Sequence, residues 1–187
     1  MVWCEVPEHQ EEEFNRWYNE EHLAERLSVP GLLSAARYEA VSSGPKHLAV
    51  YELESPAVME SPEYLEIRRA PTEWSKRMSP EFIGTVYVRN IYEQLHPSAV
   101  SDETAASPMA PVLQIGRMDI PPETESEWNC WYNTVYVPNY EKVPEVIRGR
   151  RYRAVVGEPK YLTMYDFEHE AVSQSAEWAY QQTAHPD

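Results

Sequence analysis

The chain has 187 residues, of which 31 are acidic and 16 basic, and its formal charge is -15. No basic stripe is present to neutralise phosphates, so we expect neither nucleic acid nor an anionic membrane as a partner. The longest apolar runs are far shorter than the ~20 residues that span a bilayer. Only two cysteines occur, which fits a reducing compartment, and a cytoplasmic location is expected.

The first half of the chain predicts alternating strands and helices. Carboxylates are favoured near the positive end of a helix dipole, and the acidic segment EHQEEE is typical of a helix start. Phe14, Trp17 and Tyr18 follow at helical spacing, and Pro30 ends that helix. The other predicted elements are strands at 2–7, 33–41 and 47–54, a helical stretch at 56–78 and a strand at 82–95. The order βαββαβ is that of a ferredoxin-like unit.

The second half repeats the first at a constant shift of 114 residues. The motif Trp-Tyr-Asn occurs at 17–19 and again at 131–133, and the register continues without a gap. The matched positions include Val29-Pro30 with Val143-Pro144, Arg37-Tyr38 with Arg151-Tyr152, Tyr51 with Tyr165, and Ala57-Val58 with Ala171-Val172. A shared register of this length predicts two homologous modules.

We therefore predict an α+β fold of two ferredoxin-like βαββαβ modules, at residues 1–95 and 112–187. The Pro/Ala/Ser-rich segment 96–111 is predicted to be a linker. The second module stops inside or just after its second helix, so it is predicted to lack its last strand. A missing strand leaves backbone hydrogen-bonding groups at a sheet edge. Either a second copy of the chain covers these edges, as a homodimer, or the module tolerates them.

Alternation along the third strand of each module divides its side chains between two faces. His47, Ala49 and Tyr51 share one face, and Leu48 and Val50 share the other. We expect the apolar Leu48 and Val50 to pack against the helices. The face that carries Tyr51, and Tyr165 in the second copy, is then expected to point into the space between the modules.

Two stretches, FNRWYNEEHLAERLSVPGLLSAARYEAV (14–41) and GPKHLAVYELESPAVMESPEYL (44–65), resemble the EthD-like branch of the dimeric α+β barrel superfamily. Proteins of that superfamily combine two ferredoxin-like units, usually from two chains, whose sheets close into a barrel-like space. The resemblance implies that duplication has replaced the dimer, giving an intramolecular barrel with a ligand cavity between the modules. Its members include cofactor-free oxygenases, cyclases of aromatic polyketides, decarboxylases and haem enzymes, so the fold does not fix the reaction.

His22 is the leading catalytic candidate. It lies four residues after Tyr18 on one helical stripe, and a histidine can take or give a proton near neutral pH. The resemblance also implies a histidine of this helix beside the ligand. The second module has Tyr136 at the equivalent position, so we expect a one-sided site. The structural alternative is a histidine that faces solvent or supports the helix next to Glu20 and Glu21.

Tyr18 and Tyr51 complete the predicted catalytic group, because their hydroxyl groups could stabilise negative charge on a substrate oxygen. The residues predicted to bind the substrate are Arg37, Trp17, Asn19, His47, Tyr132, Tyr136, Tyr165 and Arg151. Each has a structural alternative. The tyrosines could be buried and satisfied by backbone carbonyls, the arginines could form ion pairs, Asn19 could cap local backbone, and Trp17 could be core.

The six histidines are scattered and form no HxH or HExxH spacing, so we predict no metal site and no cofactor. The sequence favours a cofactor-independent lyase or cyclase that abstracts a proton from a small aromatic or polyketide-like substrate, followed by cyclisation, dehydration or decarboxylation. Two alternatives stay open. One is a non-catalytic ligand-binding or accessory protein, and the other is a cofactor-free monooxygenase of the same fold.

Overall fold

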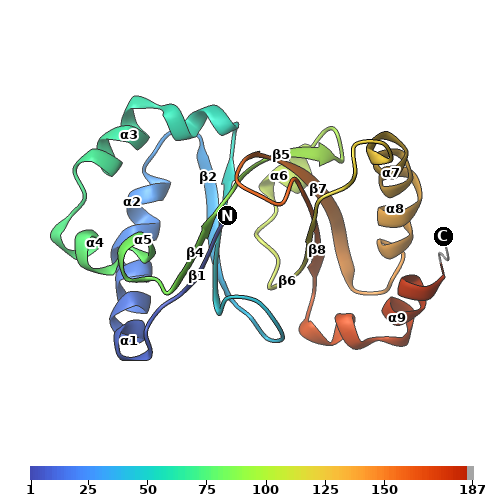
Figure 1. Ribbon diagram of the computed structural model, residues 1–187, viewed down its shortest axis with the longest axis horizontal. Helices are drawn as coiled ribbons and strands as arrows, with labels where there is room; N and C mark the ends of the chain where they lie inside the picture. The colour runs from blue at the N-terminus through green and yellow to red at the C-terminus, as the bar shows by residue number, and fades with distance from the viewer. Residues whose placement is uncertain (185–187) are drawn as a thin grey trace. The chain divides into compact units, whose positions relative to one another are not determined.

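The computed structural model describes residues 1–184. The chain divides into two compact units. The first contains Met1–Ile91 together with Val155–Gly157, and the second contains Tyr92–Ala154 and the chain from Glu158 on. Each unit has one four-stranded sheet with helices on one of its faces (Figure 1). Among the described residues, none of the helices combines the length and the apolar character that a bilayer span requires.

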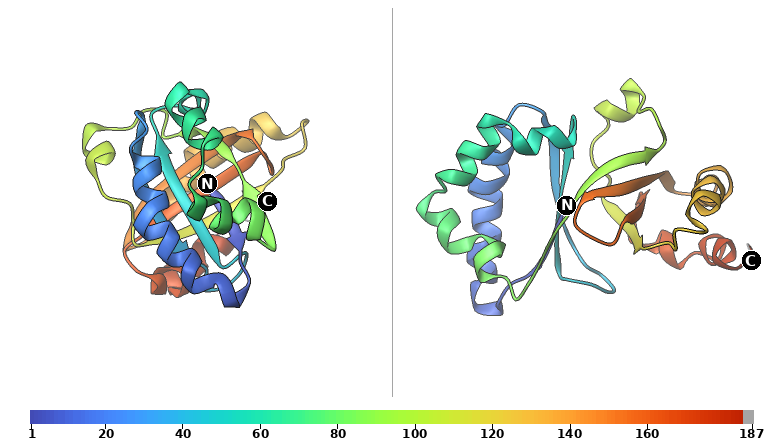
Figure 2. Two further views of the ribbon diagram at one scale, coloured as in Figure 1. Left: turned by 90° about the vertical axis from the view of Figure 1, so that its left-hand side faces the viewer. Right: turned by 45° about the horizontal axis from the view of Figure 1, so that its top comes forward.

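The first unit has the predicted order of elements. Its antiparallel sheet runs β2-β3-β1-β4, the strand order of a ferredoxin-like unit, and the left view of Figure 2 looks onto its helices. The strands are β1 (Val2–Glu5), β2 (Leu32–Glu39), β3 (His47–Leu53) and β4 (Val86–Arg89). The helices are α1 (Glu8–Trp17), a π-helical turn (Tyr18–His22), α2 (Leu23–Leu27), a 3-10 helix (Pro56–Glu60), α3 (Pro62–Arg69), α4 (Glu73–Met78) and α5 (Pro80–Ile83).

The second unit repeats this plan with one difference in its sheet. The strands are β5 (Ile91–His96), β6 (Val112–Met118), β7 (Val146–Val156) and β8 (Tyr161–Phe167). The helices are α6 (Asp102–Ala106), α7 (Glu125–Trp131), a π-helical turn (Tyr132–Tyr136), α8 (Val137–Tyr140), a 3-10 helix (Glu170–Gln174) and α9 (Ala176–Thr183). The sheet order is β5-β7-β8-β6. The α+β fold of two ferredoxin-like modules is confirmed.

The strand predicted at 82–95 is in fact two strands in two sheets. Strand β4 ends at Arg89 and pairs with β1, whereas β5 begins at Ile91 and lies beside β7. The buried Asn90 separates them. Strand β5 occupies the edge opposite to the one that a last strand of the second module would fill, so β6 stays at the edge of its sheet. Within the described residues, the second module has no fourth strand of its own, as predicted.

Two further predicted segments are more broken than expected. The helical stretch at 56–78 is a 3-10 helix followed by α3 and α4, and Pro56 and Pro62 each begin one of these pieces. The predicted linker at 96–111 contains helix α6, capped by the Ser101 hydroxyl, which accepts a hydrogen bond from the Thr104 amide. Both differences follow from proline and serine, which start new helical turns.

The prediction for the faces of the third strand is wrong. Ala49 belongs to the cluster with Phe14, Trp17 and Tyr18 under the first helix, and Tyr51 packs against that cluster. Tyr165 likewise packs with Tyr140 and Trp178 under the helices of the second unit. The tyrosine face is therefore the helix-covered face. Large aromatic rings fill the deep space between a helix and a sheet, and the aliphatic side chains take the opposite face.

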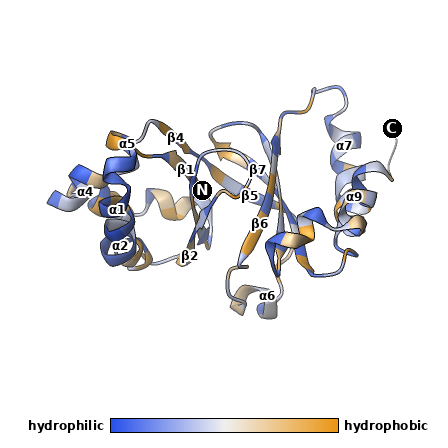
Figure 3. Cartoon of the chain, turned by 90° about the horizontal axis from the view of Figure 1, so that it is seen from below, coloured by the Kyte–Doolittle hydropathy of each residue, from blue (hydrophilic) through white to orange (hydrophobic). Residues whose placement is uncertain are grey.

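Hydropathy follows the layers of each unit (Figure 3). Helices α1 and α2 are mostly hydrophilic, whereas β1, β4 and β6 carry hydrophobic stretches. The helix-covered core of the first unit therefore depends on a few large side chains of α1 and its π-helical turn, of which Phe14, Trp17 and Tyr18 are almost completely buried.

Candidate functional site

Arg37 of β2 lies beneath the first helix and is held there by two asparagine side chains. Its register partner is Ala49 of β3, on the helix-covered face. Nη1 donates to Asn19 Oδ1 at 3.2 Å and Nη2 donates to Asn15 Oδ1 at 2.6 Å. The guanidinium carbon is 4.5 Å from the centre of the Tyr18 ring. These contacts tie the helix to the sheet.

The second unit reproduces this arrangement around Arg151, which is fully buried. Its Nη2 donates to Asn129 Oδ1 at 2.8 Å, and its Nη1 donates to the Asn133 side chain. The guanidinium lies 4.5 Å from the Trp128 ring and 4.8 Å from the Tyr132 ring. The Tyr-Asn part of the repeated motif therefore forms the ring and the carboxamide that hold an arginine beneath the first helix of each unit, half-buried at Arg37 and fully buried at Arg151.

His22 lies at the end of the π-helical turn in an aromatic setting. Its ring centre is 4.4 Å from that of Trp17 and 4.8 Å from that of Tyr18. Nδ1 is buried and makes no hydrogen bond. Burial, followed by the positive charges of Arg26 and Arg37, lowers the pKa of His22 to about 3. The imidazole is therefore neutral at neutral pH, with an unsatisfied nitrogen.

Two charged side chains of α2, Glu25 and Arg26, form a small polar group next to His22. Arg26, one helical turn further on, has a buried Nη1 without a hydrogen-bond partner, and its guanidinium is 5.5 Å from the Tyr64 ring. Its Nη2 is 3.7 Å from Glu25 Oε2, and the two side chains are 16% and 20% exposed. Burial raises the pKa of Glu25. Glu25 and Arg26 are thus partly open to solvent, and Arg26 keeps one guanidinium nitrogen without a hydrogen-bond partner.

Two phenols lie next to this group. The Tyr51 hydroxyl donates to the Tyr18 hydroxyl at 3.4 Å. Burial raises the pKa of Tyr51 to about 12 and holds the pKa of Tyr18 well above its usual range. Both are protonated at neutral pH, so together they can offer a proton to an oxygen of a ligand. The structure thus brings together His22, Tyr18 and Tyr51, as the sequence predicted.

The same region of the second unit is filled by aromatic rings. Tyr136 stacks on Tyr132 with ring centres 4.2 Å apart, and its hydroxyl donates to the Tyr140 hydroxyl at 3.2 Å. Tyr140 packs against Trp178 at 4.5 Å and against Tyr165 at 5.3 Å. Where the first unit has an imidazole and a guanidinium with unsatisfied nitrogens, the second has a packed phenol cluster.

Four positions carry this difference between the units. They are His22 and Tyr136, Glu25 and Asn139, Arg26 and Tyr140, and Tyr64 and Trp178. Only the first pair was predicted from the sequence. Arg26 follows His22 by four residues, and the constant shift of the repeat matches Arg26 to Tyr140. These two facts together could have identified the third pair from the sequence. The same spacing links Asn15 to Asn19 and Asn129 to Asn133.

The remaining predicted residues lie away from His22 or in the core. Trp17 is fully buried, and its indole N–H lies 3.2 Å from both Glu21 Oε1 and Ser75 Oγ. His47 is buried against Phe14, with ring centres 5.2 Å apart. The residues of the second unit, Tyr132, Tyr136, Tyr165 and Arg151, share one helix-covered core. A groove of about 290 Å³ elsewhere in that unit is lined by Lys142, Val143, Pro144, Ala176, Glu177, Tyr180 and Gln181 and contains none of the predicted site residues.

Lowering the pH from 7 to 5 is expected to reduce the free energy of unfolding by about 2 kcal/mol through His22 alone. The pKa of His22 is about 3 in the folded protein and about 6.5 in an unfolded chain. Between these values the unfolded chain binds more protons, so stability falls as the pH falls. Urea denaturation of the wild type and His22→Gln at both pH values measures the difference. An identical pH dependence in the two proteins would contradict this assignment.

No protein-family model and no curated protein sequence matches the chain. Its fold is similar to a crystal structure named "putative monooxygenase" from Lactobacillus acidophilus, with a TM-score of 0.56, 9% identity, and coverage of 97% of this chain and 83% of that one. A crystal structure named "putative chlorite dismutase" is similar with a TM-score of 0.62, 11% identity, and coverage of 97% and 82%. At such identities the similarity establishes the fold alone.

Proposed function

We propose that the protein is a cofactor-independent enzyme of the EthD-like branch that moves a proton beside a carbonyl of a small aromatic or polyketide-like substrate, with cyclisation, dehydration or decarboxylation as the outcome. The observation that carries this proposal is the buried Nδ1 of His22, which has no hydrogen-bond partner. Buried polar atoms are normally satisfied, and those that are not are candidates for contact with a ligand.

The neighbours of His22 support a reaction that builds negative charge on oxygen. The neutral imidazole is the form that accepts a proton. With a pKa near 3 it is a weak base in the empty protein, and the negative charge that develops on the substrate raises this pKa, because an anion favours the imidazolium. Arg26, with an unsatisfied Nη1, and the Tyr18 hydroxyl, whose own proton is not used in its hydrogen bond from Tyr51, then stabilise the oxyanion.

Deuterium exchange tests the proposed step without knowledge of the final product. The protein is incubated in D₂O with a panel of small aromatic ketones, 1,3-diketones and β-keto acids, and NMR follows exchange of the proton beside the carbonyl. His22→Gln, which has no proton-accepting nitrogen, should lose at least ~100-fold of the exchange rate. Tyr136→Phe at the equivalent position of the second unit is the matched control and should exchange at the wild-type rate. The proposal fails if the wild type exchanges no member of the panel, or if His22→Gln keeps its rate.

A cofactor-free monooxygenase is the second candidate, favoured by the similarity in fold to the structure named "putative monooxygenase". His22 would deprotonate an electron-rich phenol in the same site, and the phenolate would bond to oxygen through a ring carbon that carries a hydrogen. The resulting hydroperoxide would lose water to leave a quinone, so the substrate itself supplies the electrons that reduce oxygen. Consumption of dissolved oxygen by the protein and a polyhydroxylated aromatic, without any added cofactor, would favour this reaction over the lyase or cyclase type.

A further inference from the structure

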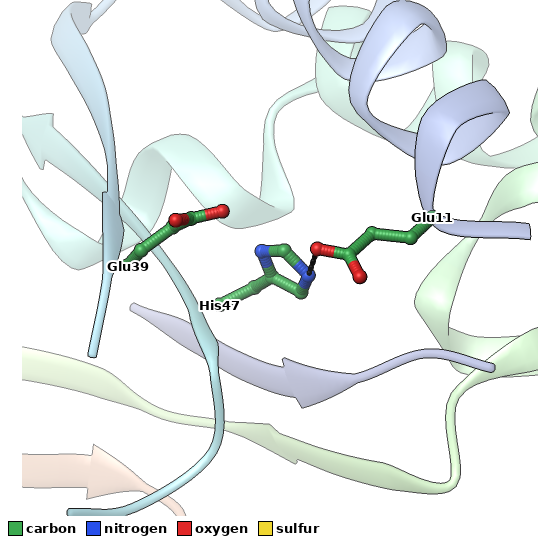
Figure 4. A group of neighbouring side chains, drawn as sticks. All are labelled: Glu11, Glu39 and His47. Atoms are coloured by element: carbon green, nitrogen blue, oxygen red, sulfur yellow. Dashed lines mark ion pairs between the residues drawn. The ribbon is translucent and has the colours of Figure 1, made fainter. Parts of the chain in front are cut away.

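Three side chains of the first unit converge at the base of its first helix. Glu11 comes from α1, Glu39 from the end of β2 and His47 from the start of β3, and one ligand atom of each lies within 4.8 Å of the others. Glu39 and His47 are register partners across the hairpin. The imidazole of His47 lies between the two carboxylates (Figure 4).

His47 lacks the partners that a buried imidazole normally has. It is only 3% exposed, and neither Nδ1 nor Nε2 makes a hydrogen bond. Nε2 is 3.5 Å from Glu11 Oε1, too far for a strong hydrogen bond. In the neutral imidazole one of these two nitrogens carries no proton and presents a free lone pair.

We propose that Glu11, Glu39 and His47 bind a divalent transition-metal ion, of which Zn²⁺ is the natural probe. One imidazole nitrogen and one or two carboxylate oxygens are a ligand set that suits Zn²⁺. Metal coordination would supply the missing partner of His47 and join α1 to the β2–β3 hairpin. This site is separate from His22 and does not depend on the proposed reaction.

The second unit has replaced this combination of residues. His47 corresponds to Tyr161 and Glu39 to Arg153, whereas Glu11 corresponds to Glu125. There the Tyr161 hydroxyl donates to Glu125, and Lys160 forms an ion pair with the same carboxylate. A phenol and a guanidinium at these positions remove two of the three ligands, so the second unit serves as an internal comparison.

Lys46 is the resident cation with which a metal ion must compete. Its Nζ forms an ion pair with Glu11, and its side chain is 46% exposed. Because the lysine is so exposed, its ammonium group can turn to solvent when an ion binds. Removing this charge should therefore strengthen metal binding, whereas removing a carboxylate ligand should weaken it.

Isothermal titration with Zn²⁺ of the full chain tests these two opposite effects. The wild type should bind one ion that Glu39→Gln binds at least ~10-fold more weakly, and Lys46→Gln should bind it more tightly than the wild type. Glu39 is exposed, so its substitution leaves the fold intact. Glu8→Gln, at an exposed acidic residue of the same helix, is the matched control and should bind as the wild type does. Equal Zn²⁺ affinity of the wild type and Glu39→Gln would overturn the proposal, because binding would then occur elsewhere on this acidic chain.

Discussion

Replacing Asp166 by alanine is expected to lower the free energy of unfolding by about 3–5 kcal/mol. Asp166 is fully buried on β8 and faces two arginines of β7. Nη2 of Arg150 donates to both carboxylate oxygens, at 2.8 and 3.0 Å, and Nε of Arg148 donates to one of them at 2.5 Å. Without the carboxylate, the buried guanidinium of Arg150 keeps its charge but loses two charge-assisted hydrogen bonds, and Arg148 loses one, which is the main cost.

Urea denaturation followed by tryptophan fluorescence measures this loss. Glu168→Ala, two residues further along the chain and exposed, is the matched control and should change stability by no more than about 0.5 kcal/mol. Asp166→Asn separates charge from shape, because it keeps the volume of the side chain and one acceptor oxygen. The free energy of unfolding of Asp166→Asn should lie between that of the wild type and that of Asp166→Ala. A loss in Asp166→Ala as small as in Glu168→Ala would show that the two arginines find other partners.

The internal repeat made most of the fold predictable from the sequence. Because two copies share one register, each copy corrects the element boundaries of the other, and strand order follows from the ferredoxin-like pattern. The division at Asn90 was not predictable in this way. The segment 82–95 reads as one continuous strand, and only pairing between distant parts of the chain, of Val2 with Arg89 for example, decides where one sheet ends.

The error over the faces of the third strand has a physical cause. Alternation shows which side chains share a face but not which face the helices cover. The aliphatic Leu48 and Val50 were expected to pack against the helices because apolar side chains usually form the core. Both residues are indeed buried, and so is Ala49 on the opposite face. When both faces of a strand are buried, hydrophobicity no longer distinguishes them.

The candidate site was predicted only in part. His22 and Tyr18 lie close to each other as expected, because helical spacing fixes local direction. Tyr51 reaches Tyr18 only because its face of β3 is the helix-covered one, contrary to the prediction. Arg26 was missed, since a charged residue near the end of a helix is typical of a solvated surface. Asn15 and Asn129 were missed for a similar reason, and Asn19, predicted to bind the substrate or to cap backbone, accepts from Arg37 instead. Their significance depends on a strand that follows later in the sequence, whose arginines donate to these carboxamides.

Arg151→Ala is expected to destabilise the protein by about 3–5 kcal/mol, since hydrogen bonds to charged groups are each worth about 1.5–3 kcal/mol. Its guanidinium is fully buried, donates to Asn129 and Asn133, and lies over the rings of Trp128 and Tyr132. The substitution leaves the carboxamide oxygens of Asn129 and Asn133, both half-buried, without this donor. It also removes cation–π contacts, which contribute about 0.5–2 kcal/mol.

Arg37→Ala provides a comparison inside the same chain. Arg37 makes the equivalent contacts with Asn15 and Asn19 but is only half-buried, so water can replace part of what is lost. We expect a cost about 1–2 kcal/mol smaller than at Arg151, because exposed polar groups regain hydration. Arg151→Lys keeps the charge but loses the planar guanidinium that reaches both asparagines. Its free energy of unfolding should lie between that of the wild type and that of Arg151→Ala. Equal losses at Arg37 and Arg151 would contradict the explanation by burial and would indicate that the asparagine contacts alone determine the cost.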